Sequence, residues 1–132
     1  MPLENAFTVE CWRNGNNDFN IYKSSVFEFY STYCNSYYKT ASGSVSNNSL
    51  GWNSVSDDNW HFWSYVYGGT YVAVYRDGVV VTYRDGLSQS LNTNDNKLYV
   101  DCRNIDELRI SRTARSADEI AAYYAVAKDL IQ

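Results

Sequence analysis

The acidic residues and the single histidine are the side chains of this sequence that could carry catalysis. A retaining glycosidase needs two carboxyl groups about 5–5.5 Å apart on one face, and period-two spacing on a strand would align them. The sequence has no such spacing, because Asp106 and Glu107 are adjacent and Asp57 and Asp58 lie in a polar run. His61 has no motif that would pair it with a nucleophilic cysteine or serine. The sequence therefore predicts that the protein is not an enzyme.

Aromatic and amide side chains offer a different chemistry, the binding of sugars. The chain contains 13 Tyr, 4 Trp and 5 Phe residues, and the C–H surface of a sugar stacks on such rings while Asn and Asp bond its hydroxyl groups. Alternation predicts that Trp12, Trp60 and Phe62 lie in the core and that Trp63 lies on an open face. Core packing is an equal alternative for Trp52. The candidate ligand-binding residues are Trp52, Asn53, Trp63, Tyr67 and Tyr71.

Three oxygen-rich segments could hold calcium, which needs several clustered carboxylate and carbonyl oxygens. They are residues 15–18, 57–59 and 92–96. None has the spacing of an EF-hand, so solvated loop acids are the competing interpretation. The candidate metal ligands are Asp18, Asp57, Asp58 and Asn59.

The three cysteines, Cys11, Cys34 and Cys102, are widely spaced and odd in number. This pattern fits no CxxC-type zinc site, and we expect buried, reduced thiols, with one disulfide plus one thiol as the alternative. With no basic or apolar leader at Met1–Asn5, we expect synthesis in a reducing cytoplasm without a signal peptide.

The size and charge of the chain exclude several classes of protein. Its 132 residues suit one domain, residues 1–132, with a core of its own. The net charge of −4 and pI near 4.8 argue against general nucleic-acid binding. No apolar stretch approaches the roughly 20 residues of a membrane-spanning helix, so we expect no membrane insertion.

Period-two alternation dominates the chain and predicts an antiparallel all-β sandwich. An Asp-Gly pair at 77–78 predicts a type I′ turn within a meander over residues 60–84. The expected strands are 7–13, 19–22, 25–33, 37–40, 45–50, 60–67, 71–76, 79–84, 97–101 and 105–111. Ser116-Ala117-Asp118-Glu119 has the form of a capping box and predicts one short C-terminal helix over about 117–131, packed on a sheet.

Four blocks in order resemble the laminin-G-like, concanavalin A-like jelly-roll family. Phe7–Trp12 resembles its "FTVSAW" strand, Trp60-His61-Phe62 its "WHH", and Tyr75–Val80 its "LYVDGVLV" hairpin. The tail from Ile105 to Ile120 is similar to its "IDEVRIYNRALSADEI" ending. The resemblance implies a concanavalin A-like sandwich with His61 and Asp106 in structural roles. It also implies calcium at one sandwich end in many members.

Two departures from the family bear on assembly. The family's first strand, which precedes the "FTV" strand, is truncated or absent here, and the segment between Tyr99 and Ile105 is short. A missing edge strand would leave backbone groups for a neighbour to pair with, so we expect a homo-oligomer or a scaffold partner.

The sequence thus predicts a non-catalytic module that binds a glycan or surface polysaccharide. We expect this module to belong to a larger assembly. A virion surface protein, such as a phage capsid decoration or fibre domain, fits these features. The alternatives are a purely structural docking sandwich that binds no ligand and, more remotely, a glycosidase remnant.

Overall fold

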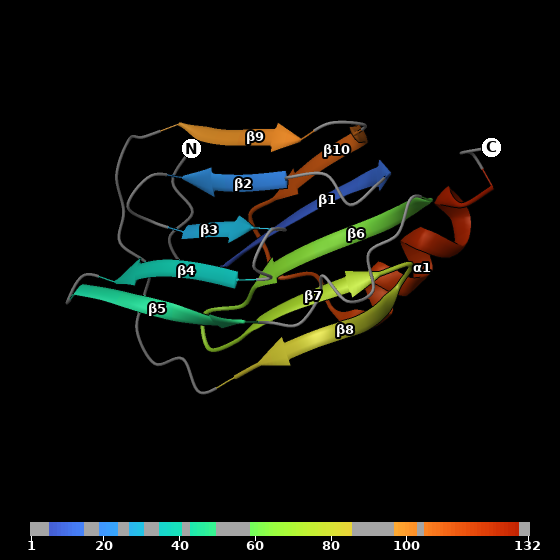
Figure 1. Ribbon diagram of the computed structural model, residues 1–132. Helices are drawn as coiled ribbons and strands as arrows, with labels where there is room; N and C mark the ends of the chain where they lie inside the picture. Colours follow the sequence, from blue (N-terminus) through green and yellow to red (C-terminus); the bar gives the residue numbers. More distant parts are fainter. Residues whose placement is uncertain are drawn as a thin grey trace.

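The computed structural model describes residues 6–14, 19–23, 27–30, 35–40, 43–49, 59–85, 97–102 and 105–129. Within them the chain forms two antiparallel sheets of five strands each and one C-terminal helix (Figure 1). The first sheet has the order β10 (Ile105–Ser111), β1 (Phe7–Asn14), β6 (Trp60–Tyr67), β7 (Val72–Arg76) and β8 (Val79–Arg84). The second has the order β5 (Gly43–Ser49), β4 (Asn35–Thr40), β3 (Phe27–Tyr30), β2 (Phe19–Lys23) and β9 (Leu98–Cys102).

This architecture is the antiparallel β-sandwich that the alternation predicts, and it is of the jelly-roll type that the resemblance implies. Each of the ten expected strands is present. The third is described over Phe27–Tyr30, and the rest of its expected range, residues 25–26 and 31–33, lies outside the described residues. No described helix combines the length and apolar character needed to cross a membrane.

The turn between β7 and β8 confirms the predicted type I′ geometry. Asp77 and Gly78 both have positive φ, 53° and 82°, as this turn requires at its two central positions. Gly78 also lies against the helix, because a β carbon there would come 3.1 Å from Ala121 Cα. The hairpin therefore reaches the helix at a position where a side chain has little room.

Helix α1 (Ala117–Ala127) begins at the predicted capping box. Ser116 Oγ accepts a hydrogen bond from Glu119 N at 3.1 Å, and Glu119 Oε1 accepts one from Ser116 N at 3.1 Å. The predicted end near residue 131 is wrong for the described part of the chain, since the helix ends at Ala127 and Lys128–Asp129 form a turn. The short helix leaves part of the sheet beneath it uncovered.

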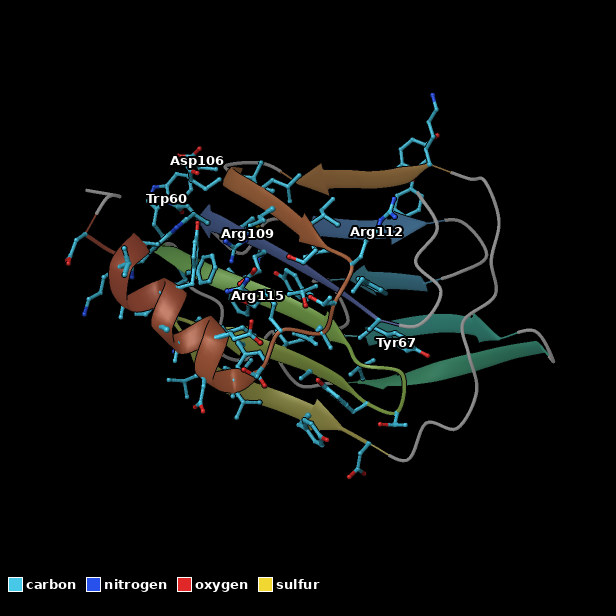
Figure 2. All side chains as sticks on the ribbon, turned by 180° about the vertical axis from the view of Figure 1, so that it is seen from behind. Trp60, Tyr67, Asp106, Arg109, Arg112 and Arg115 are labelled. Carbon is cyan, nitrogen blue, oxygen red and sulfur yellow. The ribbon has the colours of Figure 1, made fainter. Side chains whose placement is uncertain are left out.

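Helix α1 covers part of one face of the first sheet, and the second sheet covers the other face (Figure 1; from behind in Figure 2). We call these the helix face and the sandwich face. The core cluster that includes helix residues Ile120 and Ala127 draws on the helix face, and its strand members are Trp12, Phe62, Val66, Ala73 and Tyr75. Alternation places the buried residues Val9, Cys11, Trp63, Tyr65 and Val74 on the sandwich face.

Two of the predicted tryptophan environments are therefore wrong. Trp63, expected on an open face, is 2% exposed, because that face turns toward the second sheet. Trp60, expected in the core, is 44% exposed, because it lies at the start of β6 where the helix no longer covers the sheet. Trp12 and Phe62 are buried as predicted.

Candidate functional site

An exposed pair of stacked tyrosines lies at one end of the β7–β8 hairpin. The ring centroids of Tyr71 and Tyr83 are 5.3 Å apart with an interplanar angle of 21°. Tyr83 is 55% exposed and Tyr71 is half-buried. Tyr83 stands opposite Ala73 in the register of β7 and β8, and Tyr71 precedes Ala73 by two positions. We call Tyr71 and Tyr83 the tyrosine pair.

Gly68 lets Tyr71 take this position. A β carbon on Gly68 would lie 2.1 Å from Tyr71 Cε1, a distance that no side chain could occupy. The backbone closes the same turn, since Gly68 N donates a hydrogen bond to Tyr71 O at 2.9 Å. The turn between β6 and β7 thus orients the half-buried member of the tyrosine pair.

The pKa values of two phenol groups in this region, those of Tyr71 and Tyr75, are raised above the ordinary value. Burial, with the neighbouring Tyr83 adding to it, raises the pKa of Tyr71. Burial also raises the pKa of Tyr75, with smaller contributions from Tyr71 and Tyr83. A neutral phenol both donates and accepts hydrogen bonds. The tyrosine pair therefore offers an apolar ring surface bordered by hydroxyl groups.

Of the predicted ligand-binding residues, Tyr71 belongs to this exposed pair, but Tyr67 and Trp63 do not. Tyr67 is buried at the end of β6, where its ring stacks on Phe7 with centroids 5.7 Å apart. Trp63 is buried beside the Arg13 guanidinium, which lies 5.5 Å from its ring centroid. Neither ring has an exposed face for a ligand, which corrects the expected open face of Trp63 and the choice of Tyr67 as a ligand-binding residue.

The remaining predicted site residues lie outside the described ranges or at their margin. Trp52, Asn53, Asp18, Asp57 and Asp58 are outside them, and Asn59 is exposed immediately before β6. Among the described residues, no group of three or more His, Cys, Asp or Glu side chains is placed to hold a metal ion. Calcium binding therefore stays a prediction. Cys11 is a buried thiol.

Sequence reasoning missed Tyr83, although the sequence carried a signal for it. The Asp77-Gly78 turn sets which residues of β7 and β8 pair. Counting residues away from the turn along both strands places Tyr83 beside the start of β7, next to Tyr71. The β-bulge between Val74 and Tyr75 shifts this count by one residue. A bulge changes which residues share a face, and periodicity alone does not reveal it.

The buried carboxylate of Glu10 holds the helix rather than a substrate. Arg109 donates to Glu10 Oε1 from Nε at 3.1 Å and from Nη2 at 2.8 Å. Arg115 Nε lies 3.2 Å from the same oxygen without the alignment of a hydrogen bond, and Ser64 Oγ donates to Oε2 at 3.2 Å. Arg109 and Arg115 lie together between the strands and helix α1 (Figure 2). The negative charge of Glu10 is thus compensated by Arg109 and Arg115 within the fold.

The histidine is likewise tied into the fold, as the family resemblance implies. His61 Nδ1 lies 2.6 Å from Asp77 Oδ2, and Phe62 N donates to Asp77 Oδ1 at 2.9 Å. Asp106 also bonds the backbone, since its Oδ1 accepts from Glu107 N at 2.9 Å. Both acids named in the sequence motifs therefore support backbone geometry.

Comparison with solved structures agrees with the fold. The binding domain of Paraclostridial mosquitocidal protein 1 superposes with a TM-score of 0.68 at 14% identity, over 96% of this chain and 38% of that chain. The botulinum neurotoxin DC binding domain in complex with SialylT superposes with a TM-score of 0.61 at 12% identity, over 92% of this chain and 35% of that chain. The botulinum neurotoxin serotype G binding domain superposes with a TM-score of 0.62 at 12% identity, over 95% of this chain and 37% of that chain.

This chain therefore spans well under half the length of these structural neighbours. No protein-family model and no curated protein matches the sequence. At such identities the likeness establishes the fold alone, an antiparallel jelly-roll β-sandwich closed by a C-terminal helix.

Proposed function

We propose that this domain is a non-catalytic binding module that recognises a glycan through the tyrosine pair. The observation that carries the proposal is the stacked, exposed arrangement of Tyr71 and Tyr83. Aromatic rings held in place by their neighbours bind with little loss of side-chain freedom. Their hydroxyl groups add polar contacts at the edge of the platform.

The state of the described polar residues supports binding over catalysis. Glu10 is compensated by two arginines, and Asp77 is engaged by His61 and backbone. Asp106 Oδ1 accepts a hydrogen bond from the backbone N of Glu107, at the bulge between β1 and β10, so this acid supports backbone geometry. The structural neighbours are named as binding domains, and one of them is bound to SialylT.

The finer assignments of the sequence remain proposals. Membership of the laminin-G-like family is supported by the four motif blocks and by the jelly-roll fold. A virion-surface setting rests on the sequence features alone, because the neighbours are toxin binding domains.

A glycan-array screen of the purified domain, with calcium and then with chelator, tests this function. We expect binding to be lost in Tyr83→Ala and retained in Tyr99→Ala. Tyr99 is a matched control, because it is 48% exposed and stacks on Tyr22 with centroids 5.0 Å apart on the other sheet. Binding that needs calcium would assign a metal to the predicted loops, whereas equal losses in both variants would contradict the site. A folded protein that binds no glycan in either condition would contradict the function.

A structural role in assembly is the second candidate, favoured by strand β8, which lies at the edge of the first sheet among the described strands. Val79 and Val80 of this strand are both exposed, and an apolar edge strand invites pairing with another chain. A second copy of the domain is the simplest partner. Sedimentation velocity would then show a discrete oligomer that Val80→Lys dissociates, while a monomer at high concentration would contradict this role.

A further inference from the structure

The exposed tryptophan at the opposite end of β6 lies outside the tyrosine pair and outside the core. Trp60 is 44% exposed at the first position of β6. It lies two residues before Phe62, so alternation places it on the helix face. Helix α1 covers the neighbouring Trp12, whose ring centroid is 5.9 Å from that of Tyr124. The helix ends at Ala127 and leaves the Trp60 indole accessible.

A carboxylate lies beside this indole. Asp106 stands opposite Trp12 on one side of β1, and Trp60 stands opposite Asn14 on the other. Two strand spacings and two residue steps put the two α carbons about 12 Å apart. Figure 2 shows Trp60 and Asp106 next to one another at this end of the sheet. One monosaccharide stacked on the indole could therefore reach the carboxylate.

The carboxylate is held in place by the bulge that follows it. Asp106 Oδ1 accepts the hydrogen bond from Glu107 N at 2.9 Å, and Glu107 adopts the left-handed conformation with φ 53°. One carboxylate oxygen of Asp106 is thus fixed by the backbone of the next residue, while the side chain as a whole is exposed. The remaining acceptor sites suit hydroxyl donors of a ligand.

We propose that Trp60 and Asp106 form a second sugar-binding site, for an uncharged sugar. An indole face takes the C–H surface of the ring, and an ionised carboxylate accepts bonds from two neighbouring hydroxyls. Glu107, the residue after Asp106, is also exposed and adds a second negative charge. These charges disfavour an acidic sugar. The choice of a sugar as ligand rests on the proposed function.

The two sites lie at opposite ends of the first sheet. Tyr67, at the tyrosine-pair end of β6, is separated from Trp60 by seven residue steps, which correspond to about 23 Å. Helix α1 lies over the sheet between the two ends (Figure 2). Each site therefore takes its own sugar, and a surface bearing many glycans would be bound with an avidity above that of either site.

The test follows the indole N–H signal of Trp60 by NMR, assigned with Trp60→Phe, while lactose, maltose and N-acetylglucosamine are added to millimolar concentrations. We expect at least one of these sugars to shift the signal, and sialyllactose to shift it less. Asp106→Ala, an exposed substitution, should weaken that binding about tenfold. Arg112→Ala, also exposed but at the far end of β10, should leave it unchanged.

Tyr83→Ala separates this inference from the proposed function. The Trp60 shift should persist in that variant, because the tyrosine pair is distant. If none of the three sugars moves the Trp60 signal while the array binding still depends on Tyr83, the second site is overturned and the proposed function stands. If Asp106→Ala and Arg112→Ala bind equally, the carboxylate has no part in the site and the assignment is likewise overturned.

Discussion

Arg109 donates two hydrogen bonds to one oxygen of the fully buried Glu10, and its guanidinium lies 3.8 Å from the centroid of the Tyr123 ring. One side chain of β10 thus joins a carboxylate on β1 to an aromatic ring on helix α1. A charge-assisted pair and a cation–π contact share the same donor. The helix is therefore fastened by charge as well as by apolar packing.

Arg109→Met should destabilise the domain by about 2 kcal/mol, because Glu10 then keeps a buried carboxylate with only part of its compensation. Arg112→Met is the matched control, since Arg112 is exposed, and it should change the free energy of unfolding by less than about 0.5 kcal/mol. Urea denaturation measures both. Equal effects of the two substitutions would show that Glu10 does not depend on Arg109.

Much of the fold follows from local pattern, because alternation, the Asp-Gly turn and the capping box each specify backbone geometry within a few residues. The environments of the tryptophans depend on what covers each face. A strand covered on both faces is buried on both, so alternation assigns Trp60 and Trp63 to different faces without saying which face is open. The exposure of Trp60 depends on where helix α1 ends, a property of distant residues.

The candidate site was predictable only in part, because local pattern identifies one member of the tyrosine pair and distant pairing supplies the other. Tyr71 is identified by its position beside the Gly68-Gly69 turn, which local sequence reveals. Its partner Tyr83 comes from the register of β7 and β8, which includes a bulge. Tyr67 is buried and stacks on Phe7, a contact between strands 60 residues apart in sequence that no local pattern encodes.

Gly68→Ala should abolish glycan binding as Tyr83→Ala does, while the domain stays folded. The added methyl group would overlap the Tyr71 ring, 2.1 Å away, and displace it from the tyrosine pair. Far-ultraviolet circular dichroism should be unchanged, because the ring is only half-buried and can move outward. Glycan-array binding by a correctly folded Gly68→Ala protein at the wild-type level would contradict the role of Tyr71.

Asp77→Gly should cost about 2 kcal/mol, since it keeps a residue suited to positive φ but removes the bonds to Phe62 N and His61 Nδ1. Asp77→Asn should cost less, about 1 kcal/mol, because asparagine tolerates this conformation and retains one acceptor. Thermal unfolding compares the pair. If Asp77→Gly is as stable as the wild type, the turn conformation alone maintains the hairpin.

The capping box should make stability depend on acidity. The hydrogen bond from the Ser116 backbone lowers the pKa of Glu119 from its ordinary value of 4.5, with the Ser116 side chain and the Arg115 charge adding to the effect. Because the folded-state pKa is the lower one, the stabilising contribution is present above 4.5 and is lost as the pH falls through the folded-state pKa. Glu119→Gln should remove this component. Unfolding curves of both proteins across that pH window should converge at low pH, and parallel curves would contradict the cap's ionic contribution.

Glu107→Gly should stabilise the domain, unlike most substitutions. Glu107 occupies the left-handed region with φ 53° at the bulge between β1 and β10, and a β carbon there costs about 1–2 kcal/mol. Glycine removes that strain but loses more chain entropy on folding, so the expected net gain is about 0.5–1 kcal/mol. Glu107→Ala is the control, because alanine also lacks the carboxylate but retains the β carbon. A gain in the free energy of unfolding for glycine alone would establish backbone strain at the bulge. Equal gains for both variants would instead trace the effect to the removed negative charge beside Asp106.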